Sequence, residues 1–286
     1  MAAIILAKRN LRIYFRDRSA VFFSLLAVFI ILGLYLVFLG DVWTESLSDV
    51  EGAKELMNSW IVAGLLTVTG VTTTLGAFSA MVDDKVRKVS KDFSSTPVSK
   101  VLIVGGYICS AFLIGLLMSI LTFVLGELYI VLVGGRMLPP GSVCKVLGLI
   151  VLNTMTSTSI VLFIVSLIGS INAFSNISIV IGTLIGFLTG MYLPIGQLPD
   201  WVQFGMKCFP ITYSAGMFRQ VMMEREMAAS FEGISAEYLR EFQIEMGNVF
   251  VFGDYTVSPE LSVLFLLITT GIFFMLSVFR LSRKIK

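Results

Sequence analysis

The feature that most constrains this chain is an uncharged run that extends from Val146 to Pro199. A single α-helix of that length would be about 80 Å long at roughly 1.5 Å per residue, whereas the hydrocarbon core of a bilayer is roughly 30 Å thick. The run therefore predicts two membrane-spanning helices joined by a turn. The polar, glycine-containing stretch GSINAFSN, residues 169–176, is the best place for that turn.

Other uncharged runs are also long enough to cross a bilayer, which takes about 20 residues. Charged residues make up only 14% of the chain, against about 25% in typical soluble domains. We therefore predict an all-α integral membrane protein with one transmembrane domain over residues 1–286. The six predicted transmembrane helices cover residues 20–39, 59–82, 101–126, 146–168, 176–193 and 260–280.

The distribution of Lys and Arg predicts how these helices are oriented, because basic residues gather in the short cytoplasmic loops of membrane proteins. Residues 1–18 carry five, residues 81–100 carry five and residues 280–286 carry four. The loops at 40–58 and 134–145 carry only one and two. Both termini are therefore predicted to be cytoplasmic.

The chain lacks the residue patterns of an enzyme. It contains no histidine, the commonest general base and metal ligand. It has no H-E-x-x-H, C-x-x-C or G-x-S-x-G motif, and no G-x-x-x-x-G-K-[ST] loop for nucleotide phosphates. We therefore predict no catalytic residue, no metal site and no cofactor bound by this chain, and an intramembrane enzyme is the least supported class.

Glu127 is the one acidic residue near a predicted span that could serve as an ion relay. If the third span begins near Val101, about 20 residues carry it across the bilayer. Glu127 then lies at the outer interface. An interfacial role and a relay role in an ion-coupled carrier both stay open.

Residues 1–18 predict an amphipathic helix on the cytoplasmic membrane surface. Lys8, Arg12 and Arg16 recur every fourth residue and therefore share one helical face. Such helices lie in the headgroup plane with their basic side toward anionic lipid. A plain basic tail that only sets topology is the alternative. The neighbouring apolar stripe consists of Ile4, Ala7, Leu11 and Phe15.

Small and polar residues are frequent in two of the predicted spans. The second contains TVTGVTTTLGAFSA (67–80), and the fourth contains NTMTSTS (153–159). Ser, Thr and Gly let helices approach closely and hydrogen-bond across the contact. The alternative is that these faces line a cavity for an amphiphilic substrate, with Thr69 and Thr73 as the candidate residues.

The fifth predicted span contains GTLIGFLTG, with Gly182, Gly186 and Gly190 at intervals of four. A double G-x-x-x-G on one face is typical of close helix packing in membranes. The pattern predicts that another helix approaches this face.

The segment 192–222 is too polar to span a bilayer and too apolar for a free loop. Pro194, Pro199 and Pro210 rule out one continuous helix. Trp201 and its aromatic neighbours suit the outer membrane interface. We predict a re-entrant or interfacial hairpin of two short helices.

A polar excursion, residues 223–258, follows the hairpin. We predict that it is external and holds a helix near residues 235–246.

Three of these features occur in an order that resembles the type-2 permease family of ABC transporters. A basic amphipathic N-terminal helix precedes six spans. The charged loop DKVRKVSKDFSSTPVSK (84–100) follows the second span, and LPIGQLPDW…FPITYSAGMFRQ (193–220) follows the fifth. The resemblance covers essentially the full chain. Members of this family are membrane subunits of exporters for drugs, antimicrobial peptides, lipids and polysaccharides.

The resemblance implies that two copies of a separate cytoplasmic ATPase subunit bind ATP and Mg. Residues 83–100 would hold a coupling helix seated in a cleft of that ATPase. Phe93 would supply an apolar anchor, and Pro97 would end the element because it biases Thr96 away from the helical region. The implied contacts are Arg87, Lys88, Lys91, Asp92, Phe93, Thr96, Pro97 and Val98.

The resemblance also implies a second permease chain, identical or a sister, that encloses the pathway together with this one. The N-terminal helix would touch the ATPase, and the glycines of the fifth span and the threonines of the second would lie at or near the pathway. The hairpin would form an extracellular gate, with Pro194, Pro199, Trp201 and Pro210 as its candidate residues.

The function that the resemblance implies is ATP-driven export. We expect the chain to lie in the plasma membrane of a bacterial cell. The excursion 223–258 is longer than in polysaccharide exporters and favours a drug, an antimicrobial peptide or a lipid-like amphiphile as cargo. A membrane-resident sensor or scaffold and an ion-coupled carrier stay as alternatives. Membrane lipid is an expected partner and nucleic acid is not.

Overall fold

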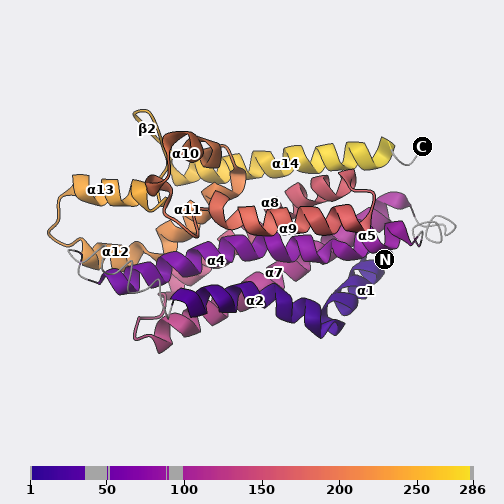
Figure 1. Cartoon of the computed structure of the whole chain (residues 1–286), viewed down its shortest axis with the longest axis horizontal. Helices are drawn as coiled ribbons and strands as arrows, with labels where there is room; N and C mark the ends of the chain where they lie inside the picture. Colours follow the sequence, from indigo (N-terminus) through magenta and orange to yellow (C-terminus); the bar gives the residue numbers. More distant parts are fainter. Residues whose placement is uncertain (1, 36–49, 51, 88, 90–98, 284–286) are drawn as a thin grey trace.

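The computed structural model describes residues 2–35, 50, 52–87, 89 and 99–283 as an elongated bundle of helices lying side by side (Figure 1). The helices of the bundle are α1 (Ala2–Arg16), α2 (Arg18–Leu34), α4 (Ala53–Ala77), α5 (Ser79–Val86), α7 (Lys100–Leu132), α8 (Pro140–Leu167), α9 (Ile171–Leu188) and α14 (Pro259–Arg283). Helix α1 and the last turns of α14 lie at the same end, next to α5 (Figure 1). We call this the α5 end.

Within the described residues, five helical segments are long and apolar enough to cross a membrane. They are Ala53–Val86, Val101–Leu132, Pro140–Leu167, Ile171–Leu188 and Pro259–Leu281. The apolar helix Ser24–Leu34 is shorter. Residues 36–49 lie outside the description, so the first predicted span, 20–39, stays a prediction.

The turn between the fourth and fifth predicted spans is shorter than expected. Helix α8 ends at Leu167 and α9 begins at Ile171, so residues 171–176 are helical. Ser170 explains the early start, because its side chain accepts a hydrogen bond from the Ala173 N–H at 3.2 Å. This is the N-cap arrangement that Ser favours.

Gly190 does not continue the glycine face that the sequence predicts. Helix α9 ends at Leu188, and Gly190 has a φ of 64°. The Met191 N–H donates to the Gly186 carbonyl at 2.8 Å, as at a helix C-terminus closed by a left-handed glycine. The prediction of three glycines on one face is therefore wrong, and Gly182 and Gly186 alone stay on the helix.

The close neighbour of Gly186 is the Tyr192 ring of the same chain, whereas the space beside Gly182 is open in the described structure. Gly182 is thus the position where a further helix has room to approach.

Helix α4 lies at the centre of the bundle and packs against α7, α8 and α11. A Cβ at Gly70 would meet Asn153 of α8, and a Cβ at Gly115 of α7 would meet Thr74. The small residues thus allow the close packing typical of membrane helices. Thr69 and Thr73 are both buried within this one chain, and the Thr73 hydroxyl donates to the Thr69 carbonyl at 2.6 Å. Their proposed place at the pathway stays a prediction.

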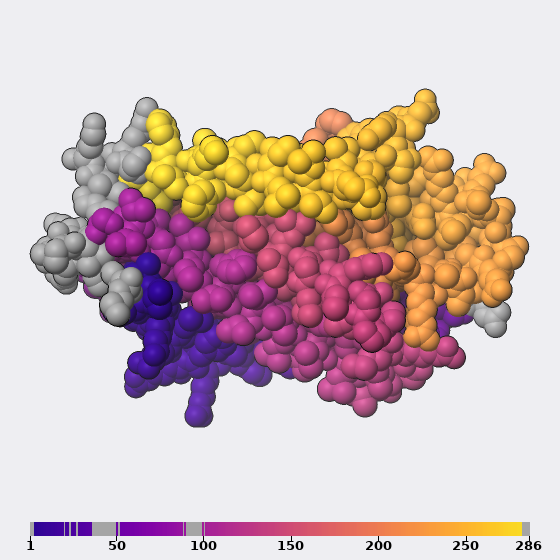
Figure 2. All heavy atoms as spheres, turned by 180° about the vertical axis from the view of Figure 1, so that it is seen from behind, coloured from indigo at the N-terminus to yellow at the C-terminus, as the bar shows by residue number. Residues whose placement is uncertain are grey.

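The opposite end of the bundle, which we call the hairpin end, carries the remaining elements (Figures 1 and 2). They are η2 (Ile195–Gln197), α10 (Asp200–Lys207), α11 (Pro210–Met222), α12 (Glu224–Ser230), α13 (Ala236–Glu245), β1 (Val251–Phe252) and β2 (Tyr255–Thr256). Helices α10 and α11 are two short helices where the hairpin is predicted, and the re-entrant or interfacial position of that hairpin stays a prediction. Helix α13 confirms the predicted helix near 235–246, and the Ser235 side chain caps it by accepting from the Tyr238 N–H at 3.3 Å.

Candidate functional site

Of the predicted ATPase-coupling residues, Arg87 alone lies in the described part of the chain. It follows α5 directly and forms an ion pair with Asp83 one turn earlier, with Nε 2.8 Å from Oδ1. Both side chains are well exposed, so the pair adds little to stability. The other residues, Lys88, Lys91, Asp92, Phe93, Thr96, Pro97 and Val98, lie outside the described residues.

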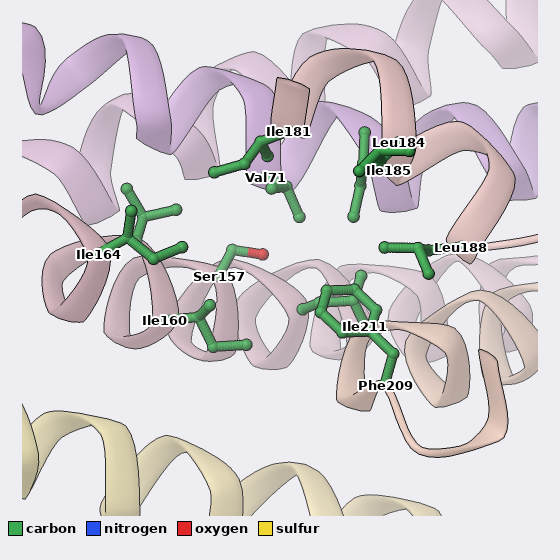
Figure 3. A pocket seen from close by; sticks show the side chains of 11 residues that line it. Val71, Ser157, Ile160, Ile164, Ile181, Leu184, Ile185, Leu188, Phe209 and Ile211 are labelled. Atoms are coloured by element: carbon green, nitrogen blue, oxygen red, sulfur yellow. The ribbon is translucent and has the colours of Figure 1, made fainter. Parts of the chain in front are cut away.

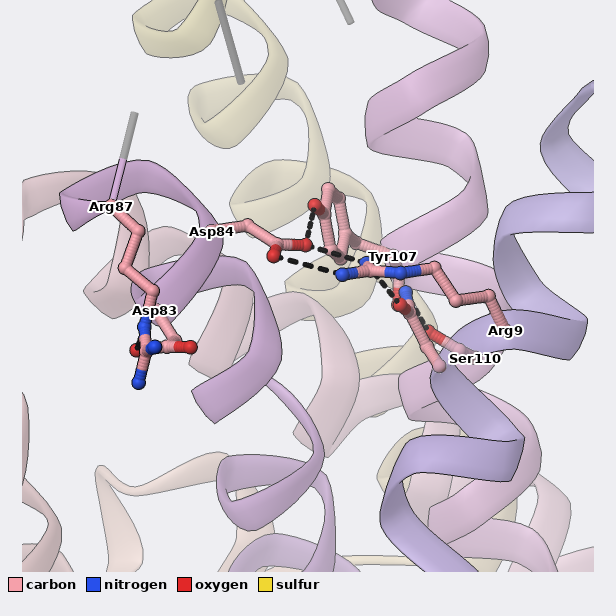
Figure 4. Close-up of polar contacts among 7 residues, drawn as sticks. Arg9, Asp83, Asp84, Arg87, Tyr107 and Ser110 are labelled. Carbon is pink, nitrogen blue, oxygen red and sulfur yellow. Dashed lines mark hydrogen bonds and ion pairs between the residues drawn. The ribbon is translucent and has the colours of Figure 1, made fainter. Parts of the chain in front are cut away.

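The next residue of α5, Asp84, makes much stronger contacts (Figure 4). Its carboxylate accepts two hydrogen bonds from the guanidinium of Arg9 in α1, at 2.6 and 3.0 Å. It also accepts one from the Tyr107 hydroxyl of α7 at 2.5 Å. Asp84 is 6% exposed, and such bidentate, charge-assisted bonds are among the strongest in proteins. The same bonds raise the pKa of Arg9 above its usual value. One carboxylate thus joins α1, α5 and α7.

Neighbouring residues extend this contact. Asn10 of α1 donates to the Ser110 hydroxyl of α7 at 3.2 Å, and that hydroxyl donates to the Tyr107 carbonyl at 2.9 Å. We call Arg9, Asn10, Asp84, Tyr107 and Ser110 the α5 polar cluster. It holds the first helix of the chain against the start of α7.

Helix α5 has a further attachment on another side. The Lys85 ammonium donates to the Ile168 carbonyl in the turn between α8 and α9, at 2.5 Å. Two successive residues, Asp84 and Lys85, therefore tie the start of the predicted coupling segment, residues 83–100, to α1, to α7 and to the α8–α9 turn.

Helix α1 packs on the bundle through a face about which the sequence made no prediction. Lys8, Arg12 and Arg16 are exposed, as a lipid-facing basic side requires. Of the predicted apolar stripe, however, Ile4 and Phe15 are also exposed. The buried face consists of Leu6, Ala7, Asn10 and Tyr14.

At the hairpin end, Arg219 of α11 is completely buried. Its Nη2 donates to the carbonyls of Thr189 and Gly190 at 3.0 and 2.8 Å. Its Nη1 donates to the Gly247 carbonyl at 3.4 Å, and its guanidinium lies 4.8 Å from the centre of the Trp60 ring of α4. Burial lowers the pKa of Arg219, whereas carbonyl oxygens at the negative end of α9 favour the charged form.

Arg219 therefore links the hairpin to the end of α9, to α4 and to the turn after α13. The Trp60 indole N–H adds to this link by donating to the Met246 carbonyl at 2.9 Å. A second link from hairpin to α9 is the Thr212 hydroxyl, which donates to the Leu188 carbonyl at 2.8 Å. No pattern in the sequence singled out Arg219, although an arginine within an aromatic, interfacial segment is itself a signal that carbonyl or anionic partners lie nearby.

The predicted gate residues occupy distinct places in the hairpin. Pro194 is buried and precedes η2, Pro199 precedes α10 and Pro210 is the first residue of α11. Proline suits such helix starts because it has no N–H to leave unpaired. Trp201 is 79% exposed. The structure thus gathers these residues in one hairpin, with Trp201 on its surface.

An apolar cavity of about 120 Å³ separates α9 from α8 (Figure 3). Ile181, Leu184 and Ile185 of α9 face it, as does Ile160 of α8. The polar side chain in its lining is Ser157, whose hydroxyl has no hydrogen-bond partner among the described residues. Helix α9 is therefore held at its two ends but not packed tightly against α8 between them.

Glu127 lies near the end of α7 and is 4% exposed. Its Oε2 accepts from the Leu138 N–H at 3.0 Å, and Oε1 has no partner in the described structure. It thereby fastens the connection between α7 and α8. The position of Glu127 at the outer membrane interface remains a prediction.

Comparison with known proteins gives two results. No curated protein matches the chain. A family model described as ABC-2 type transporter matches residues 1–223, which contain the α5 polar cluster and the whole hairpin. The match ends where the excursion 223–258 begins. Because it covers well over half of the chain, this protein belongs to the ABC-2 type transporter family.

Proposed function

We propose that this chain is the membrane subunit of an ATP-driven exporter and that residues 83–100 couple it to a separate ATPase. The family is that of ABC transporter permease components. The observation that carries the coupling proposal is the attachment of α5: the segment just before the predicted docking residues is bonded to α1, α7 and the α8–α9 turn.

The contacts suggest how movement of the docking residues reaches the hairpin end. A shift of residues 88–98 pulls on α5, and Lys85 passes the shift to the start of α9 through Ile168. Helix α9 can respond because a cavity separates it from α8. Its far end is bonded to Arg219, so the hairpin moves with it.

The remaining parts of the proposal are those that the resemblance and the charge pattern of the sequence imply. Two ATPase copies hold ATP and Mg, and a second permease chain, identical or a sister, completes the pathway. The protein resides in a bacterial plasma membrane with both termini in the cytoplasm. The cargo is a drug, an antimicrobial peptide or a lipid-like amphiphile.

The test is reconstitution of the chain with its ATPase in liposomes. Phe93→Asp is expected to abolish cargo-stimulated ATP hydrolysis and leave membrane insertion intact, because it removes the apolar anchor. Wild-type coupling in this variant would contradict the docking proposal. Normal ATP hydrolysis by the wild-type protein without vectorial movement of any cargo would instead support a sensor or scaffold.

The buried carboxyl of Glu127, with one unpartnered oxygen, is the observation that bears on an ion-coupled carrier. Such a carrier predicts gradient-driven transport without ATP that Glu127→Gln abolishes. We expect instead that Glu127→Gln retains ATP-driven export, because the amide can still accept from the Leu138 N–H.

A further inference from the structure

A larger cavity, of about 880 Å³, lies at the hairpin end among α8, α11, α12, α13 and the start of α14. Its volume falls within the range of roughly 300–1,000 Å³ that small-molecule sites occupy. Most of its lining residues come after residue 223, beyond the part of the chain that the family model matches.

Three side-chain amides line this cavity, and each uses its nitrogen to bond the protein. Gln220 donates to the Asn248 carbonyl at 2.5 Å, Gln243 to the Met227 sulfur at 3.3 Å and Asn248 to the Met223 sulfur at 3.5 Å. Carbonyl oxygens and thioether sulfurs only accept, so these contacts assign the nitrogen end of each amide. The three amide oxygens are left as acceptors.

The clearest of these unused acceptors is Asn248 Oδ1. The residue is 1% exposed, and this oxygen has no hydrogen-bond partner among the described residues. Buried polar atoms are normally paired, and among the partnerless buried atoms of the described residues Asn248 Oδ1 is the one whose side chain lines this cavity. A ligand N–H could supply its partner.

The charged side chains at the cavity also favour a positively charged hydrogen-bond donor. Lys145 is paired with Glu224, with Nζ 3.3 Å from Oε2. Glu260, at the start of α14, also lines the cavity and takes part in none of the ion pairs among the described residues. The excursion 223–258 holds seven acidic and two basic residues, a net charge of −5.

From these observations we infer that the cavity binds a cationic amphiphile: an ammonium or guanidinium group on an apolar body. Glu260 and the amide oxygens receive the N–H groups, and Leu239 and Val257 supply apolar wall. If the chain is an exporter, this inference gives the chemical class of its cargo or of a ligand that regulates it. The binding itself requires no ATPase.

The experiment titrates the full chain in lipid nanodiscs with dansylcadaverine, a primary ammonium on a dansyl-bearing five-carbon chain. N-pentyl dansylamide, which lacks the ammonium, is the matched neutral probe. We expect the ammonium probe to bind about tenfold more tightly than the neutral probe, because one charge-assisted hydrogen bond changes an affinity by roughly that factor. Equal affinity for the two probes would overturn the proposal.

Two pairs of variants locate the site. Ala228 is exposed on α12 and lines the cavity, whereas Ala229 is exposed beside it and does not line it. Ala228→Trp should abolish specific binding and Ala229→Trp should preserve it. Glu260→Gln should weaken binding about five- to tenfold. Asp254→Asn, in the turn between β1 and β2, should leave binding unchanged.

Wild-type affinity in Ala228→Trp, or equal loss in both tryptophan variants, would contradict this location. The inference and the proposed function fail separately: Phe93→Asp should lose ATP coupling and keep dansylcadaverine binding. Ala228→Trp should lose dansylcadaverine binding and keep the basal ATP hydrolysis of the reconstituted complex, which needs no ligand in the cavity.

Discussion

At the scale of single residues, Asp84 and Arg219 each carry a charge that is buried in the protein. The charges of these two residues are stabilised by different kinds of partner. Asp84 is paired with a guanidinium and a phenol, so its charge is balanced directly. Arg219 has three carbonyls and an aromatic ring as partners, so partial charges replace a counterion. Each would be costly to bury without these contacts.

Asp84→Asn should lower the free energy of unfolding by about 1–3 kcal/mol, because Arg9 loses a charged, bidentate partner. Thermal unfolding of the purified chain measures this. Coupled ATP hydrolysis should fall as well if α5 transmits the movement. The matched control is Asp83→Asn, in a neighbouring carboxylate that is far more exposed and forms its ion pair with Arg87, one turn later. A double-mutant cycle with Arg9→Gln isolates the pair, and additive effects would contradict a direct interaction.

Arg219→Lys should destabilise the protein by about 2–5 kcal/mol, although the charge is kept. A lysine ammonium lacks the planar fork that reaches carbonyls on α9 and after α13 at once. The measurement is again thermal unfolding, with Arg225→Lys as the control in a less buried arginine of α12. Equal thermal stability of the two variants would show that the planar guanidinium of Arg219 is not needed for the stability of the fold.

At the scale of elements, α9 has well-defined ends and packs on α4, but along its middle it is separated from α8. Ser170 caps its start and Gly190 closes its end. Lys85 attaches near the first end and Arg219 at the second. Between them, the apolar cavity separates α9 from α8. Such an element can shift as a unit without breaking its terminal bonds.

Alanine substitutions at two glycines of this region should have opposite effects. Gly190→Ala should destabilise by about 1–2 kcal/mol, because φ is positive and a Cβ would crowd Ile195. Gly182→Ala should stabilise an isolated chain by up to about 1 kcal/mol, since the site is helical and open. Thermal unfolding of both variants decides this. Weaker self-association of Gly182→Ala would instead reveal a second chain packed there.

At the scale of the whole molecule, the bonds form one connected path from the α5 end to the hairpin end. It passes through Lys85, the α8–α9 turn, α9 and Arg219. The proposed transport cycle needs α9 to move within the bundle, so a change that fills the space beside it should affect stability and export in opposite directions.

Ser157→Val provides that change, because it removes an unpartnered buried hydroxyl and fills part of the cavity. We expect about 1 kcal/mol of added stability and slower export. Thr158→Val is the control: its hydroxyl donates to the Thr154 carbonyl at 2.6 Å, and it does not line the cavity. Faster or unchanged export by a stabilised Ser157→Val would contradict the role given to α9.

The sequence by itself determined the features that depend on local physics. Long apolar runs specify membrane-spanning helices, Pro199 and Pro210 mark the starts of α10 and α11, and Ser235 marks the start of α13. Each of these signals acts within a few residues of the chain. The docking role of residues 88 and 91–98 remains a prediction, because those residues lie outside the described structure.

Only the tertiary structure decided which charges meet. Arg9 and Asp84 are 75 residues apart, and Arg219 bonds carbonyls about 30 residues away on either side. Such contacts depend on how each helix is rotated about its axis, and periodicity in one helix does not contain that information. For the same reason the exposed basic face of α1 was predictable, whereas the face that packs on α7 was not.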